Sequence, residues 1–160
     1  MNKKKTVLFY CKHNSCRSQI AEAYLKYLGR DEYEVHSAGL YPEPIHPLVY
    51  EVMEEEDVSV QGQTSNGIDL YLGKQPFDYI IIVCMESETE CPKLHPFALH
   101  VEQWPLTDPA EVTGKKDAVL DVFRDTRDEI KERIQQWIAS NQYSYDMRWN
   151  NGQCPQSRKT

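Results

Sequence analysis

The sequence predicts an α/β domain built on a four-stranded parallel sheet flanked by helices. Strand-like and helix-like segments alternate along the chain, which is the pattern that βαβ units produce. Residues 77–83 read Phe-Asp-Tyr-Ile-Ile-Ile-Val and are almost continuously apolar, as a central parallel strand covered on both faces requires. With 160 residues, the chain has room for one domain with a sizeable core.

The expected elements follow in order along the chain. Strands are expected at 6–10, 33–37, 77–83 and 98–101, and helices at 18–29, 46–56, 66–73 and 117–139. The first helix has one apolar face at helical spacing, with Gly29 placed to end it, and the face consists of Ile20, Ala23, Tyr24, Tyr27 and Leu28. We expect residues 1–140 to form the domain and 141–160 a C-terminal extension of unknown role.

Charge and composition exclude several classes of protein. The net charge of −7 argues against a nucleic-acid partner. The apolar run at 7–10 is too short for a secretion signal, and we expect no membrane partner. Five cysteines, an odd number, fit a reducing cytosol better than a disulfide scaffold. We therefore expect a cytoplasmic monomer.

The most informative stretch, Cys11 to Ser18, joins the first expected strand to the first expected helix. A cysteine, five residues and an arginine allow backbone N–H groups, the helix N-terminus and the guanidinium of Arg17 to converge on one oxyanion. That field favours the thiolate form of Cys11, a nucleophile. A buried cysteine followed by a surface arginine is the alternative. The expected oxyanion-binding residues are Lys12, His13, Asn14, Ser15, Cys16, Arg17 and Ser18.

This stretch closely resembles the start of thioredoxin-coupled arsenate reductases, which share their fold and phosphate loop with low-molecular-weight protein tyrosine phosphatases. The resemblance covers roughly residues 5 to 139 and implies a low-molecular-weight phosphatase-like, flavodoxin-like architecture. It continues through Ser37-Ala38-Gly39, His46-Pro47, Gln63-Thr64-Ser65, Ile82-Val83-Cys84, Cys91-Pro92, Asp108-Pro109-Ala110 and Arg127-Asp128-Glu129-Ile130.

The resemblance also implies roles for residues beyond the loop. Asp108 would protonate the leaving oxygen, because a carboxyl beside bound anionic charge holds a proton more readily. Cys84 and Cys91 would relay the oxidation from Cys11 to thioredoxin, the external reductant, so no bound cofactor is expected. Without the resemblance, Asp108-Pro109 reads as a turn and the two cysteines as core residues.

Two departures from the related reductases stand out. Lys12-His13 replaces the usual Thr-Gly, so we expect a reshaped loop if a positive φ is needed there. Some of these reductases bind potassium through residues matching Asn14, Glu22 and Ser37 and through an aspartate where this chain has Asn66; the lost charge argues against the ion.

These observations lead to a reading as an arsenate reductase with weak phosphatase activity, whose ligands are arsenate or phosphate. A low-molecular-weight phosphatase in which Cys84 and Cys91 take no part is the first alternative. A non-catalytic oxyanion or redox sensor is the second. A zinc site is disfavoured, since neither cysteine spacing is that of a zinc knuckle.

Overall fold

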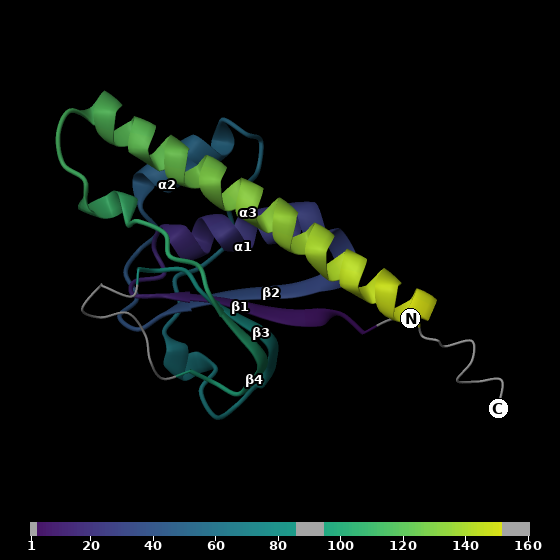
Figure 1. Cartoon of the computed structure of the whole chain (residues 1–160). Helices are drawn as coiled ribbons and strands as arrows, with labels where there is room; N and C mark the ends of the chain where they lie inside the picture. Colours follow the sequence, from purple (N-terminus) through teal and green to yellow (C-terminus); the bar gives the residue numbers. More distant parts are fainter. Residues whose placement is uncertain (1–2, 86–94, 152–160) are drawn as a thin grey trace, which may run out of the picture.

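The computed structural model describes residues 3–85 and 95–151 and contains a four-stranded parallel sheet (Figure 1). The strands are β1 (Lys5–Cys11), β2 (Tyr33–Gly39), β3 (Phe77–Ile82) and β4 (Ala98–Gln103). Their order is β2-β1-β3-β4, and all three neighbouring pairs are parallel. The predicted fold class and all four strands are therefore confirmed.

Three helices cover one face of the sheet, namely α1 (Arg17–Gly29), α2 (Pro47–Glu54) and α3 (Lys116–Asn151) (Figure 1). Short 3-10 turns complete the chain at η1 (Arg30–Glu32), η2 (Ile68–Leu70) and η3 (Pro109–Glu111). Among the described residues, none of the helices is long and apolar enough to cross a membrane.

Two helix predictions were inaccurate in length. The helix expected at 66–73 is only the turn η2, because Gly67 and Gly73 flank a segment too short to build a packed helix. Conversely, α3 runs past the expected end at 139 to Asn151. The helix thus passes residue 140 without a break, and a separate role for residues 141–160 stays a prediction.

The sheet separates two apolar clusters, as the alternation of strand side chains requires. Val7 and Phe9 of β1 pack with the three helices on one face. Leu8 and Tyr10 pack on the other face with Ile68 and Tyr71, in and beside η2. Along β1, a side chain's odd or even position therefore decides which cluster it joins.

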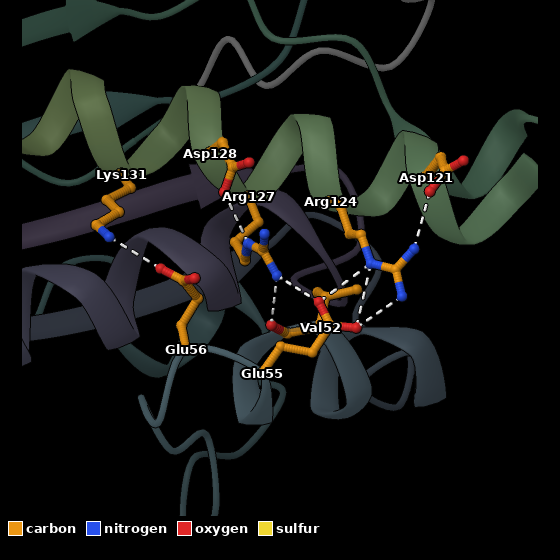
Figure 2. A network of polar contacts seen from close by, with 8 residues as sticks. All are labelled: Val52, Glu55, Glu56, Asp121, Arg124, Arg127, Asp128 and Lys131. Atoms are coloured by element: carbon orange, nitrogen blue, oxygen red, sulfur yellow. Dashed lines mark hydrogen bonds and ion pairs between the residues drawn. The ribbon is translucent and has the colours of Figure 1, made fainter. Parts of the chain in front are cut away.

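An ion-pair network fixes α2 against α3 at one end of the helical layer (Figure 2). Glu55, just after α2, binds Arg124 at 2.8 Å and Arg127 at 2.7 Å. Arg127 is buried and also donates to the carbonyl of Val52 at 2.9 Å. Lys131 pairs with Glu56 at 2.8 Å. These contacts hold the segment after α2 onto the long helix.

The strand order reverses at β1. The chain leaves β1 toward β2 on one side and later returns to β3 on the other, so β1 and β3 flank the point where the topology reverses. Open α/β sheets bind ligands at such points. The loop from Cys11 to Arg17 begins there.

Candidate active site

The loop between β1 and α1 turns its carbonyl groups outward. Those of Cys11, Lys12, His13 and Ser15 accept backbone N–H groups of Leu40 (3.1 Å), Tyr41 (2.8 Å), Glu43 (2.9 Å) and His46 (3.1 Å), and that of Asn14 accepts the side-chain amide of Gln19 (2.9 Å). In a trans peptide the N–H points opposite to the C=O. The loop's N–H groups therefore converge on its interior, where the N-terminus of α1 adds its partial positive charge.

The sulfur of Cys11 lies at the floor of this loop and has two hydrogen-bond partners. The backbone N–H of Asn14 donates to it at 3.2 Å, and the Ser18 hydroxyl lies at 3.0 Å. Ser18 Oγ also accepts a hydrogen bond from the Asn14 side-chain amide at 2.7 Å, which fixes the position of the hydroxyl beside the sulfur. The sulfur of Cys11 is thus held between the backbone of Asn14 and the side chain of Ser18.

The loop's one left-handed residue, among those described, is Asn14, with a φ of 54°. Asparagine tolerates this conformation better than most residues. Lys12 and His13 do not have positive φ, so a reshaped loop is not required by the missing glycine there. His13 instead lies half-buried with its Nδ1 at 2.9 Å from the Tyr41 carbonyl oxygen.

Arg17 and Asp108 meet beside the loop. The buried guanidinium of Arg17 donates to the carbonyl of Leu106 at 2.9 Å and lies 3.5 Å from Asp108 Oδ2. The other oxygen, Asp108 Oδ1, accepts the backbone N–H of Ala110 at 3.0 Å. Asp108-Pro109 is therefore a turn, and the same turn directs the carboxyl toward the arginine that the sequence assigns to the oxyanion.

Cys16, the second cysteine of the loop, is a buried thiol. Burial raises the pKa of Cys16 to about 12, so this group stays a thiol at neutral pH. Nearby, His46 accepts the N–H of Leu48 on its Nδ1 at 3.1 Å and packs on Phe123 with ring centroids 4.7 Å apart. Burial lowers the pKa of His46, which keeps the ring neutral. Cys16 thus forms part of the buried core beside the loop, and His46 packs against that core.

Cys84 follows β3, and its thiol is fully buried. The backbone N–H of Val83 donates to the Tyr10 carbonyl at 2.9 Å, which brings the chain before Cys84 alongside the end of β1. The two sulfurs nevertheless belong to opposite clusters, Cys11 on the helix-covered face and Cys84 on the other. Cys91 lies outside the described residues.

Sequence reasoning missed several residues that support the loop from outside. Gln19 is fully buried and bridges the carbonyls of Asn14 (2.9 Å) and Thr64 (3.0 Å). Asn66 donates its backbone N–H to Asn14 Oδ1 at 2.7 Å. Gln63 in turn donates to Gln19 Oε1 at 2.8 Å. The amide at position 19, on the apolar side of a helix next to the loop, was the available signal.

Comparison with known proteins places this geometry in a family. Residues 6–145 match the Low molecular weight phosphotyrosine protein phosphatase family. An arsenate reductase from Shouchella clausii is 35% identical over 139 residues, which are 87% of this chain and 99% of that protein. Another, from Halalkalibacterium halodurans, is 39% identical over 132 residues, 82% of this chain and 93% of that protein.

Solved structures agree with the sequence relatives. An arsenate reductase in its reduced state superposes with a TM-score of 0.68 at 35% identity, covering 85% of this chain and 98% of that one. A thioredoxin-dependent arsenate reductase from Corynebacterium glutamicum gives 0.65 at 31% identity, covering 89% of this chain and 64% of that one. The chain therefore belongs to the low-molecular-weight phosphotyrosine protein phosphatase family, among its arsenate reductase relatives.

Proposed function

We propose that this chain is an arsenate reductase that uses Cys11, Cys84 and Cys91 in succession. The observation that carries the proposal is the position of Cys84, whose thiol is buried just beyond β3, the strand that pairs with β1 and its terminal Cys11. A hydrolase has no use for a second sulfur there, whereas a reductase needs one. The relatives named arsenate reductase support the same choice.

The first step is attack of the Cys11 thiolate on arsenate. The loop N–H groups and Arg17 bind the oxyanion, and Asp108 donates a proton to the departing oxygen, which leaves as water. A sulfur–arsenic(V) bond forms as the arsenic–oxygen bond breaks. The 3.5 Å contact between Arg17 and Asp108 supports these paired roles, because it puts the acid beside the group that holds the anion.

Reduction follows when Cys84 attacks the sulfur of Cys11. A sulfur–sulfur bond forms, and the electron pair of the sulfur–arsenic bond stays on arsenic, which becomes arsenic(III) and leaves as arsenite. Cys91 then attacks the Cys84 sulfur of this disulfide and releases the Cys11 thiolate. The resulting Cys84–Cys91 disulfide is reduced by an external dithiol protein. Thioredoxin is our candidate, since one structural relative depends on it.

A coupled assay tests the proposal directly. With thioredoxin, thioredoxin reductase and NADPH, arsenate should cause NADPH oxidation that requires this chain. The same preparation should hydrolyse p-nitrophenyl phosphate only slowly. Absence of arsenate-dependent NADPH oxidation, together with efficient hydrolysis, would reject the reductase.

Phosphomonoester hydrolysis is the second candidate function. It is favoured by the contact of Asp108 with Arg17, since a loop thiolate and a general acid are all that hydrolysis requires. In that case Cys84 is a core residue, and its replacement by serine should not affect turnover.

A further inference from the structure

A buried carboxylate, Glu22, lies behind the oxyanion loop and has both oxygens engaged. The Ser37 hydroxyl donates to Oε1 at 2.6 Å, and the ammonium of Lys26 lies 2.6 Å from Oε2. Lys26 is one helical turn further along α1, the spacing and direction that suit such a pair. Burying an ionised carboxylate is costly without a compensating charge. In this protein the chain itself supplies that charge.

Hydrogen bonds connect this ion pair to the nucleophile. Asn66 donates its side-chain amide to the Ser37 carbonyl at 3.3 Å and its backbone N–H to Asn14 Oδ1 at 2.7 Å. Asn14 continues the path to Ser18 and Cys11. A change of charge at Glu22 would therefore act on the position of Asn14, the residue whose N–H and amide both serve the catalytic sulfur.

A potassium ion does not fit this arrangement. Potassium is a hard cation and takes oxygen ligands. In the related reductases that bind it, an aspartate stands where this chain has Asn66. Asn66 instead directs an NH₂ group at the Ser37 and Thr64 carbonyls, while the Thr64 hydroxyl donates to its Oδ1 at 2.9 Å. Hydrogen-bond donors or the Lys26 ammonium thus already engage Asn14 Oδ1, the Ser37 carbonyl and both oxygens of Glu22.

We propose that the ammonium of Lys26 takes the place of a bound alkali cation, as a positioning residue that supports the oxyanion loop through Glu22. Asn66 has one negative charge fewer than an aspartate, and Lys26 neutralises the carboxylate that remains. The loop of this chain is consequently independent of potassium. The inference concerns oxyanion binding and Cys11 reactivity, and it holds whether the reaction is reduction or hydrolysis.

The first test compares cations on the unmodified full-length protein. Its melting temperature, with and without inorganic phosphate, should be the same in chloride salts of potassium, sodium and tetramethylammonium at equal ionic strength. The pH midpoint of Cys11 alkylation by iodoacetamide, followed on the Cys11 peptide by mass spectrometry, should also be the same. A stabilisation or a shifted midpoint specific to potassium would overturn the proposal.

The second test uses Lys26→Met, which removes the ammonium group and keeps a long apolar side chain. Lys131→Met is the matched control, because Lys131 is a similarly exposed lysine (38% against 47%) that pairs with Glu56, a carboxylate of the segment after α2 rather than of the loop (Figure 2). Lys26→Met should weaken phosphate binding roughly tenfold, the lower end for a charge-assisted bond with one exposed partner. It should also shift the alkylation midpoint, whereas Lys131→Met should change neither and Lys26→Arg should preserve both.

The double variant Lys26→Met/Asn66→Asp completes the design. This variant has a carboxylate at position 66 and lacks the Lys26 ammonium. It should therefore regain phosphate affinity in potassium chloride and not in tetramethylammonium chloride. Equal behaviour of Lys26→Met and Lys131→Met, or a double variant that does not respond to potassium, would show that Lys26 does not substitute for the ion. None of these measurements uses arsenate, so their failure is distinct from failure of the proposed reductase.

Discussion

Gly39, the last residue of β2, lies against the backbone of the oxyanion loop. Its replacement by alanine tests whether this close packing sets the position of the loop. A Cβ at this position would lie 2.7 Å from the backbone nitrogen of Asn14 and 2.7 Å from the carbonyl carbon of His13. Ordinary contact begins at 3.4 Å, so the loop must move by about 0.7 Å. The obstacle is the peptide group that joins His13 to Asn14, and this backbone group cannot rotate away as a flexible side chain could.

The expected cost follows from that displacement. Overpacking of this kind costs about 1–3 kcal/mol, and each kcal/mol lowers the melting temperature of a domain of this size by about 2–4 °C. The larger effect is on chemistry, because misplacing a reacting group by about 1 Å can cost roughly a hundredfold in rate. We expect Gly39→Ala to lower kcat/KM for p-nitrophenyl phosphate about tenfold to a hundredfold.

Gly67→Ala is the matched control, since Gly67 forms a bridge with Gly39 and its Cβ would meet only side-chain atoms. The nearest is Asp69 Oδ1 at 2.6 Å, the end of a side chain that can turn away. Thermal melting and steady-state hydrolysis should therefore separate the two variants. If Gly39→Ala retains its rate, or if both variants lose the same amount, the argument from loop packing is refuted.

Three further predictions address the chemistry and the helical layer. Asp108→Asn keeps an oxygen for the Ala110 N–H and loses the acid, so single-turnover attack on arsenate and phosphoesters should slow by about a hundredfold or more; an unchanged rate would leave Asp108 as a turn residue only. Cys84→Ser should abolish arsenate turnover and leave phosphoester hydrolysis largely intact, and equal loss of both would contradict the division of roles. Glu55→Gln tests the ion-pair network of Figure 2, and the measurement is protein stability as a function of pH in the acid range. Arg124 and then Arg127 lower the pKa of Glu55 from 4.5 to about 2, so its contribution is present above pH 4.5 and is lost as the pH falls toward 2; the variant should be less stable at neutral pH and converge with the parent in acid.

The strands and the loop could be predicted because their signals are local. The apolar run before Cys11 and the spacing to Arg17 identify β1 and the oxyanion loop without knowledge of any distant residue. The backbone conformation within the loop was harder to predict from the sequence. Asn14, rather than position 12 or 13, has the positive φ, and this choice depends on contacts with Asn66 and Gln19.

Supporting residues escaped prediction because their roles arise from tertiary contacts. Gln19 reads as an ordinary polar residue at a helix start, yet it is buried between the loop and the carbonyl of Thr64. Likewise, Lys26 and Glu22 read as a surface ion pair on α1, and only the fold shows that the carboxylate is buried against Ser37. No periodicity in the sequence distinguishes Glu22 and Lys26 from solvent-facing residues.

Cys11 and Cys84 lie in apolar clusters on opposite faces of the sheet, and this arrangement bears differently on arsenate reduction and on phosphoester hydrolysis. Cys11 continues the odd-numbered side chains of β1 into the helix-covered cluster, while Cys84 continues Ile80 and Ile82 into the opposite one. The reductase mechanism that we propose needs a disulfide with sulfurs about 2.05 Å apart, so it predicts that Cys84 leaves its cluster before it attacks Cys11. Hydrolysis needs no such movement, since the loop, Arg17 and Asp108 are already assembled. Under the proposed function, reduction of arsenate therefore requires one conformational step that phosphoester hydrolysis does not.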